Sequence, residues 1–121
     1  MASDIKERTF AFAARVVRLC QMLDAAPGVS RTMADQLLRS GTSVGANVEE
    51  AHGSQSKTDF TAKMYIACKE ARETHYWLRL LIATDIVPEG KLAPMLDESN
   101  QLVAILTSIA KTAKNGRNHD A

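Results

Sequence analysis

Apolar residues recur along most of the chain at alternating intervals of three and four, the spacing that places side chains on one face of an α-helix. The clearest such run is Phe60, Met64, Ala67, Ala71, Thr74, Leu78 and Leu81. Similar runs are Ile5, Thr9, Phe12, Val16, Leu19 and Leu23; Met33, Leu37, Val44, Val48 and Ala51; and Leu92, Leu96, Ser99, Val103, Leu106 and Ala110, with Leu102 and Ile109 beside them. The pattern predicts four amphipathic helices and no strand.

Short stretches of helix-breaking residues at 26–28, 53–55 and 85–88 separate these runs. Because each connection is only a few residues long, consecutive helices should be antiparallel neighbours. We therefore predict an all-α, antiparallel up-down four-helix bundle that forms a single domain over residues 1–115. Beyond Lys114 the periodicity is lost, and we expect 116–121 to be a flexible C-terminal tail.

Polar residues near two of the predicted helix starts, and a proline near a third, suggest how the helices begin. Asp4 with Glu7, and Ser56 with Asp59, have the three-residue spacing of a capping box. Pro94 cannot donate a helical hydrogen bond, so the fourth helix should begin or bend near it.

The first two predicted helices carry apolar and small residues beyond those that one core needs. On the first, a second seam runs beside the core seam through Phe10, Ala13, Val17 and Cys20. On the second, Ala34, Gly41 and Gly45 recur on one side and would let another helix backbone come close. These surfaces suit self-assembly into a ring-like homo-oligomer. The candidate oligomer interface is Phe10, Ala13, Val17, Gly41, Gly45 and Trp77.

A polar stripe is the least ordinary pattern in the chain. Arg39, Ser43, Asn47 and Glu50 recur at spacings of four, four and three and share one helix face, opposite which the row Ile66, Glu70, Glu73 and Trp77 can lie. Carboxylates in such a row need partners if they are buried. The candidate polar network of Arg39, Ser43, Asn47, Glu50, Glu70 and Glu73 is either a ligand or partner site, or a structural network that sets the register of two helices.

Charge gives little support to nucleic-acid binding across the whole domain. The 121 residues include 45% hydrophobic and 24% charged side chains, with a formal net charge of +1. Basic residues nevertheless form partial stripes, near which Tyr65 and Tyr76 could stack on bases. The candidate nucleic-acid contacts are Arg8, Arg15, Arg18, Lys69, Arg72 and Arg79. The alternative is that these stripes are ordinary solvated faces.

Patterns typical of enzymes are weak or missing. Glu49 and His52 form one Glu-x-x-His spacing of the kind used in di-iron bundles, but a second is lacking because Arg72 precedes His75. No P-loop or Gly-x-Ser-x-Gly stretch occurs. We therefore expect no catalytic, cofactor-binding or metal-binding residues.

The apolar pattern also bears on where in the cell the protein is expected. No run of about 18 apolar residues and no apolar signal segment is present, so we expect a cytoplasmic protein without membrane contact. Cys20 and Cys68 lie in apolar runs, where free thiols behave as small hydrophobes.

The stretch from Leu38 to Glu50, followed by 56–60 and by Ile66 and Ala67, resembles a known family. It is similar to bacterial four-helix-bundle proteins named for genes in 23S rRNA intervening sequences, and the likeness extends from about Ile5 to Ala113. The resemblance implies an antiparallel bundle that assembles as a homopentameric ring. No enzymatic activity is established for the family.

A related branch acts as an accessory protein of diversity-generating retroelements, in which a basic pentameric barrel works with a reverse transcriptase and nucleic acid. The present chain departs from that branch because it is almost neutral. It also departs from the wider family pattern at Pro94 and at Gly45, where many relatives carry proline.

Two functions follow as expectations. The first is a non-catalytic, self-assembling scaffold or adaptor whose partner the sequence does not identify. The alternative is an accessory protein that binds structured RNA or DNA.

Overall fold

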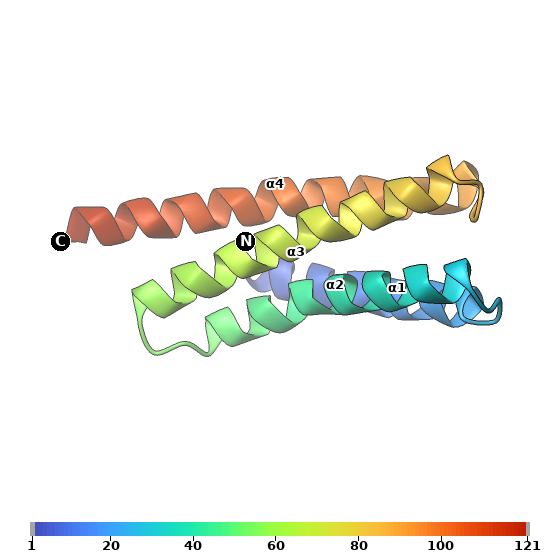
Figure 1. Ribbon diagram of the computed structural model, residues 1–121. Coiled ribbons are helices and arrows are strands. Elements are labelled where there is room, and N and C mark those ends of the chain that lie inside the picture. Colours follow the sequence, from blue (N-terminus) through green and yellow to red (C-terminus); the bar gives the residue numbers. More distant parts are fainter. Residues whose placement is uncertain (1, 121) are drawn as a thin grey trace.

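The computed structural model describes residues 2–120, with side chains from 4 to 116, and folds into four α-helices (Figure 1). These are α1 (Ala2–Leu23), α2 (Val29–His52), α3 (Lys57–Ala83) and α4 (Glu89–Asp120). No strand occurs in this range, so the predicted all-α class and the four helices are confirmed. No helix within the described chain is both long enough and apolar enough to cross a membrane.

Helices that follow one another in the chain lie side by side. The α1–α2 and α3–α4 connections are at one end of the molecule, and the α2–α3 connection is at the other (Figure 1). Backbone contact is close between each consecutive pair and sparse between α1 and α4. Over residues 2–120, α1 makes no close backbone contact with α3, and neither does α2 with α4.

The core consists largely of the residues that the apolar spacing predicted. All six members of the α1 core seam are buried, including Thr9, whose hydroxyl donates to the Ile5 carbonyl at 2.8 Å. On α3 the predicted face is buried from Met64 to Leu81. On α4 the face is rotated slightly from the prediction, since Leu102 is fully buried and Val103 only half-buried.

Helix ends agree with the prediction in part. Ser56 caps α3, with its Oγ accepting a hydrogen bond from the Asp59 amide at 3.0 Å. The predicted cap at Asp4 is wrong, because α1 begins at Ala2 and leaves Asp4 in the first turn, where its charge complements the positive end of the helix.

The last helix begins five residues before Pro94, which therefore lies in its second turn. The backbone of α4 is helical as far as Asp120, while the side chains of 117–121 lie outside the described residues. Flexibility of 116–121 stays a prediction.

Small residues on α2 bring it close to α1 of the same chain. A Cβ built at Gly41 would lie 2.7 Å from Val16 Cγ1, and one at Gly45 would lie 3.2 Å from the Thr9 carbonyl oxygen. The predicted close approach is therefore present, but its partner is the neighbouring helix. Gly41 and Gly45 are buried inside the subunit and are not on a surface that another subunit could reach.

Cys20 marks the point at which the second α1 seam turns into the core. Its Sγ lies 3.4 Å from the Ala34 carbonyl oxygen of α2, and burial raises the pKa of the thiol to about 11. The predicted seam is thus exposed at Phe10 and Val17 but buried at its last member.

We expect Cys20 to react slowly with iodoacetamide at pH 8. A pKa of about 11 against an ordinary 9.0 leaves about 100-fold less thiolate in the folded chain than in the unfolded chain. Because this raised pKa lets the folded state hold its proton longer, stability should fall as pH rises from 9 towards 11. Mass spectrometry of timed reactions measures the rate of Cys20 labelling. Labelling that is equally fast in the folded chain and in the urea-unfolded chain would contradict the prediction.

Candidate functional site

Three charged residues of the predicted polar network meet between α2 and α3. Arg39 Nη1 donates to Glu70 Oε1 at 3.2 Å, and Arg39 Nη2 donates to Glu73 Oε2. Trp77 Nε1 also donates to Glu73 Oε2, at 3.1 Å. The Glu70 side chain is 12% exposed and that of Arg39 is 49% exposed, so the cluster lies at the edge of the core.

The side chains of the other three members of the predicted network have neighbours other than the charged groups of the Arg39 cluster. Ser43 Oγ donates to the Arg39 carbonyl at 2.6 Å, and Asn47 Nδ2 donates to the Ser43 carbonyl at 2.9 Å, so both satisfy their own helix. Glu50 is exposed beside the α2–α3 connection, where it lines a separate shallow hollow with Lys63. The stripe therefore does not form one six-residue site.

One buried polar contact was missed by sequence reasoning. Thr74 Oγ1 lies 2.9 Å from Ser40 Oγ of α2 and 2.8 Å from the Glu70 carbonyl oxygen. Both residues are fully buried. The signal in the sequence was a hydroxyl within each of two facing apolar runs. Together with the Arg39 cluster beside it, this contact links α2 to α3.

An apolar strip on α1 lies exposed on the flank of that helix that faces α2. We call Phe10, Ala13 and Val17 the α1 strip. Phe10 is 73% exposed and Val17 is 37% exposed, while Ala13 is half-buried. Leu38 of α2, which is 39% exposed, lines a shallow hollow together with Val17 and extends the apolar surface.

Trp77, the remaining candidate interface residue, lies on α3 and belongs to the Arg39 cluster. Its ring packs edge-on against Tyr76 with centroids 5.1 Å apart. The structure therefore brings together three of the six candidate interface residues on α1 and places the other three elsewhere.

The six candidate nucleic-acid contacts fall into separate settings. Arg8 donates to the Glu98 carboxylate of α4 at 2.6 and 3.0 Å, and this hydrogen bonding raises the pKa of the guanidinium further above its usual value. On α3, Arg72 Nη1 lies 3.4 Å from Cys68 Sγ, Arg79 lies 5.9 Å from the Tyr76 ring centre, and Lys69 is exposed.

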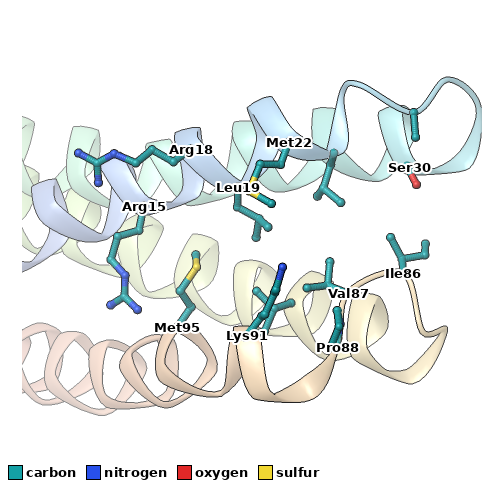
Figure 2. A pocket seen from close by; sticks show the side chains of 13 residues that line it. Arg15, Arg18, Leu19, Met22, Ser30, Ile86, Val87, Pro88, Lys91 and Met95 are labelled. Atoms are coloured by element: carbon teal, nitrogen blue, oxygen red, sulfur yellow. The ribbon is translucent and has the colours of Figure 1, made fainter.

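Arg15 and Arg18 line a groove between α1 and α4 (Figure 2). Its volume is about 600 Å³, and its walls come from the second half of α1, the start of α4 and the α3–α4 connection, with Ala26 and Ser30 at the α1–α2 end. Within residues 2–120, α1 and α3 make no close backbone contact, so the basic residues of these two helices lie on elements that are not packed against each other.

Metal-ligating residues are dispersed in the described part of the chain. No group of three or more His, Cys, Asp and Glu side chains is placed there to hold a metal ion. His52, from the single Glu-x-x-His spacing, has Nδ1 2.9 Å from the Val48 carbonyl oxygen and its ring edge-on to Phe60.

Comparison with known proteins gives a family and a fold. The sequence model described as 23S rRNA-intervening sequence protein matches residues 2–108. A crystal structure of a protein of unknown function from the S23 ribosomal protein family of Bacteroides thetaiotaomicron is 40% identical, with a TM-score of 0.84. The alignment covers 91% of this chain and 97% of that one. No curated protein matches the chain. The four-helix fold and the match over residues 2–108 together establish that this chain belongs to the 23S rRNA-intervening sequence protein family.

Proposed function

We propose that the protein is a non-catalytic scaffold or adaptor of the cytoplasm, an up-down bundle whose subunits assemble through the α1 strip into a ring, with five copies as the expected number. The exposure of Phe10 is the observation that carries the proposal. A phenylalanine that is 73% exposed leaves a large apolar surface in water, and Val17 and Leu38 enlarge it. Such surfaces on folded domains commonly mark contact with another protein.

The composition of this surface favours self-association. Aromatic anchors surrounded by smaller apolar residues are typical of the energetic centre of protein interfaces. Lys6, Glu7 and Glu49 lie around Phe10 and supply both signs of charge. A rim of mixed sign lets copies of one surface meet without net repulsion.

Replacing Phe10 and Val17 by serine should dissociate the assembly while the subunit stays folded. Because both side chains are largely outside the core, we expect the dissociation constant to rise at least about tenfold, with helix content unchanged at 25 °C. Light scattering checks the mass, which for the native ring should be five times 13.2 kDa, and circular dichroism checks the fold.

Val29→Ser is the matched control, since Val29 is 69% exposed and lies at the start of α2, away from the strip. A native protein that is monomeric at micromolar concentration would contradict the proposal. Equal loss of mass and of helix content in the variant would place Phe10 and Val17 in the folding core instead.

Nucleic-acid binding is the second candidate, and the unpaired state of Arg15 and Arg18 is what favours it. Within residues 4–116 neither guanidinium is paired with a carboxylate. Anisotropy titrations with structured RNA and duplex DNA over a salt series distinguish the candidates. Affinity that falls steeply with salt and is lost in Arg15→Ala would support phosphate contacts, because these release counterions. If neither nucleic acid binds at low salt, the scaffold is the better-supported of the two candidate functions.

A further inference from the structure

The groove between α1 and α4 is an apolar channel with charged rims, and we call it the α1–α4 groove. Leu19 and Met22 face into it from α1, and Met95 faces into it from α4 (Figure 2). Met22 is 65% exposed, so the channel is open to solvent. A volume of about 600 Å³ is within the range of pockets that take several apolar groups.

Three cations surround this channel without an acidic partner. Arg15 reaches from α1 towards α4, Lys91 reaches from α4 towards α1, and Arg18 lies further out on α1 (Figure 2). Among the residues whose side chains the structure describes, no aspartate or glutamate lines the groove. In the described range 4–116, none of the three is paired with a carboxylate.

The alignment of α1 with α4 shows that, within residues 4–116, the groove lacks an ion pair where one would be expected. Arg8 of α1 pairs with Glu98 of α4, outside the set of residues that line the groove. Seven residues, or two helical turns, further along α1 is Arg15, and seven residues back along α4 is Lys91. The position that would hold a second ion pair therefore holds two like charges. Like charges on the two sides of a groove repel each other, although water weakens the repulsion, and an anion between them turns it into attraction.

We propose that the α1–α4 groove binds an acidic amphipathic helix of a partner protein, whose apolar side chains enter the channel while its carboxylates pair with Arg15, Arg18 and Lys91. This site goes beyond self-assembly, because the α1 strip lies on the opposite flank of α1, beside α2.

A helix fits the groove better than a small anion does. The cations come from both helices that line the groove, so acidic residues on two sides of an apolar stripe can face them. Two methionines in the wall supply flexible, polarizable surface that adapts to different apolar side chains.

The test uses a fluorescein-labelled synthetic helix of about four turns, with leucines spaced three and four residues apart and glutamates beside them. A second peptide has glutamine in place of each glutamate. Anisotropy titrations compare the native protein with Lys91→Glu and Met22→Ser. Lys111→Glu makes the same charge change on an exposed part of α4 outside the groove, and Ile66→Ser truncates an exposed apolar residue of α3.

We expect the native protein to bind the acidic peptide. Lys91→Glu should lower the affinity for this peptide at least about tenfold, and Met22→Ser should lower it about fivefold. The two control variants should bind as the native protein does. Lys91→Glu should also raise the melting temperature, because it supplies the carboxylate that faces Arg15.

Several results would overturn the proposal. One is that the acidic peptide shows no saturable binding at concentrations below about 1 mM. The others are that the neutral peptide binds as tightly as the acidic one, or that both groove variants bind the acidic peptide as tightly as the native protein does. Displacement by sodium dodecanoate at the same affinity would assign the groove to a small amphiphile. A change of oligomeric mass in Lys91→Glu alone would make the groove a subunit contact. Peptide binding in Phe10→Ser separates this site from self-assembly, since it should survive even if the ring does not form.

Discussion

Gly41→Leu should prevent stable folding, and Gly41→Ala should lower the free energy of unfolding by about 1–2 kcal/mol. In most helices glycine to alanine is stabilising by up to about 1 kcal/mol, so the expected sign is reversed here. The reason is Val16, which is fully buried and whose Cγ1 and Cγ2 would lie 2.7 and 2.8 Å from the new Cβ. Valine is stiff at χ1 and cannot rotate away cheaply.

Urea unfolding followed by circular dichroism measures the effect, and a second change tests the cause. Val16→Ala alone should cost about 2 kcal/mol through the cavity that it leaves. Combined with Gly41→Ala, it should cost less than the sum of the single changes by at least about 1 kcal/mol, because the clashing methyl groups are gone.

Gly116→Ala is the matched control, because a Cβ at this position of α4 would meet nothing within 4 Å. It should be neutral or slightly stabilising. A Gly41→Ala protein as stable as the native chain would mean that α1 and α2 separate readily, and the close packing would then need another explanation.

The close α1–α2 contact illustrates both the reach and the limit of sequence reasoning. Glycines at 41 and 45 predicted a nearby helix backbone, and the contacts with Val16 and Thr9 confirm it. Spacing along one helix, however, identifies a face and not the element that covers it. Two small residues suit an intrachain neighbour and a second subunit equally well, so their partner required the packed structure.

The polar stripe had the same limit. Helical spacing correctly placed Arg39 opposite Glu70 and Glu73, because residues four apart share a face and charged groups near a core need partners. It could not show that Ser43 and Asn47 would bond to carbonyls of their own helix. Short polar side chains have this local alternative wherever they occur in a helix.

The α1–α4 groove was not predicted at all. Arg15, Lys91 and Met95 are each unremarkable within their own helices, and their placement around one channel depends on how α1 and α4 pair. One contact of that pairing joins Arg8 to Glu98, which are 90 residues apart in the chain. A periodic pattern within 20 or so residues contains no information about such a contact.

Arg39→Met should lower the free energy of unfolding by about 2 kcal/mol. The methionine keeps the apolar stem but leaves Glu70, whose side chain is only 12% exposed, without its cation. The loss should be smaller than for a fully buried pair because Arg39 is half exposed and water can reach the carboxylates. Glu73 retains the Trp77 indole as a donor, so most of the cost should arise at Glu70.

The variant pair Arg39→Met with Glu70→Gln tests that assignment, since a neutral amide no longer needs the guanidinium and much of the lost stability should return. Arg31→Met is the matched control on the same helix. The Arg31–Asp24 pair is 51% and 60% exposed, and Arg31 also donates to the Asp24 carbonyl, so this change should cost under about 1 kcal/mol. Stability that falls at Arg39 and recovers in the pair makes the cluster a device for α2–α3 register. Unchanged stability together with altered assembly would instead make Arg39 a contact for another molecule, because a charge that the fold does not need is free to act outside it.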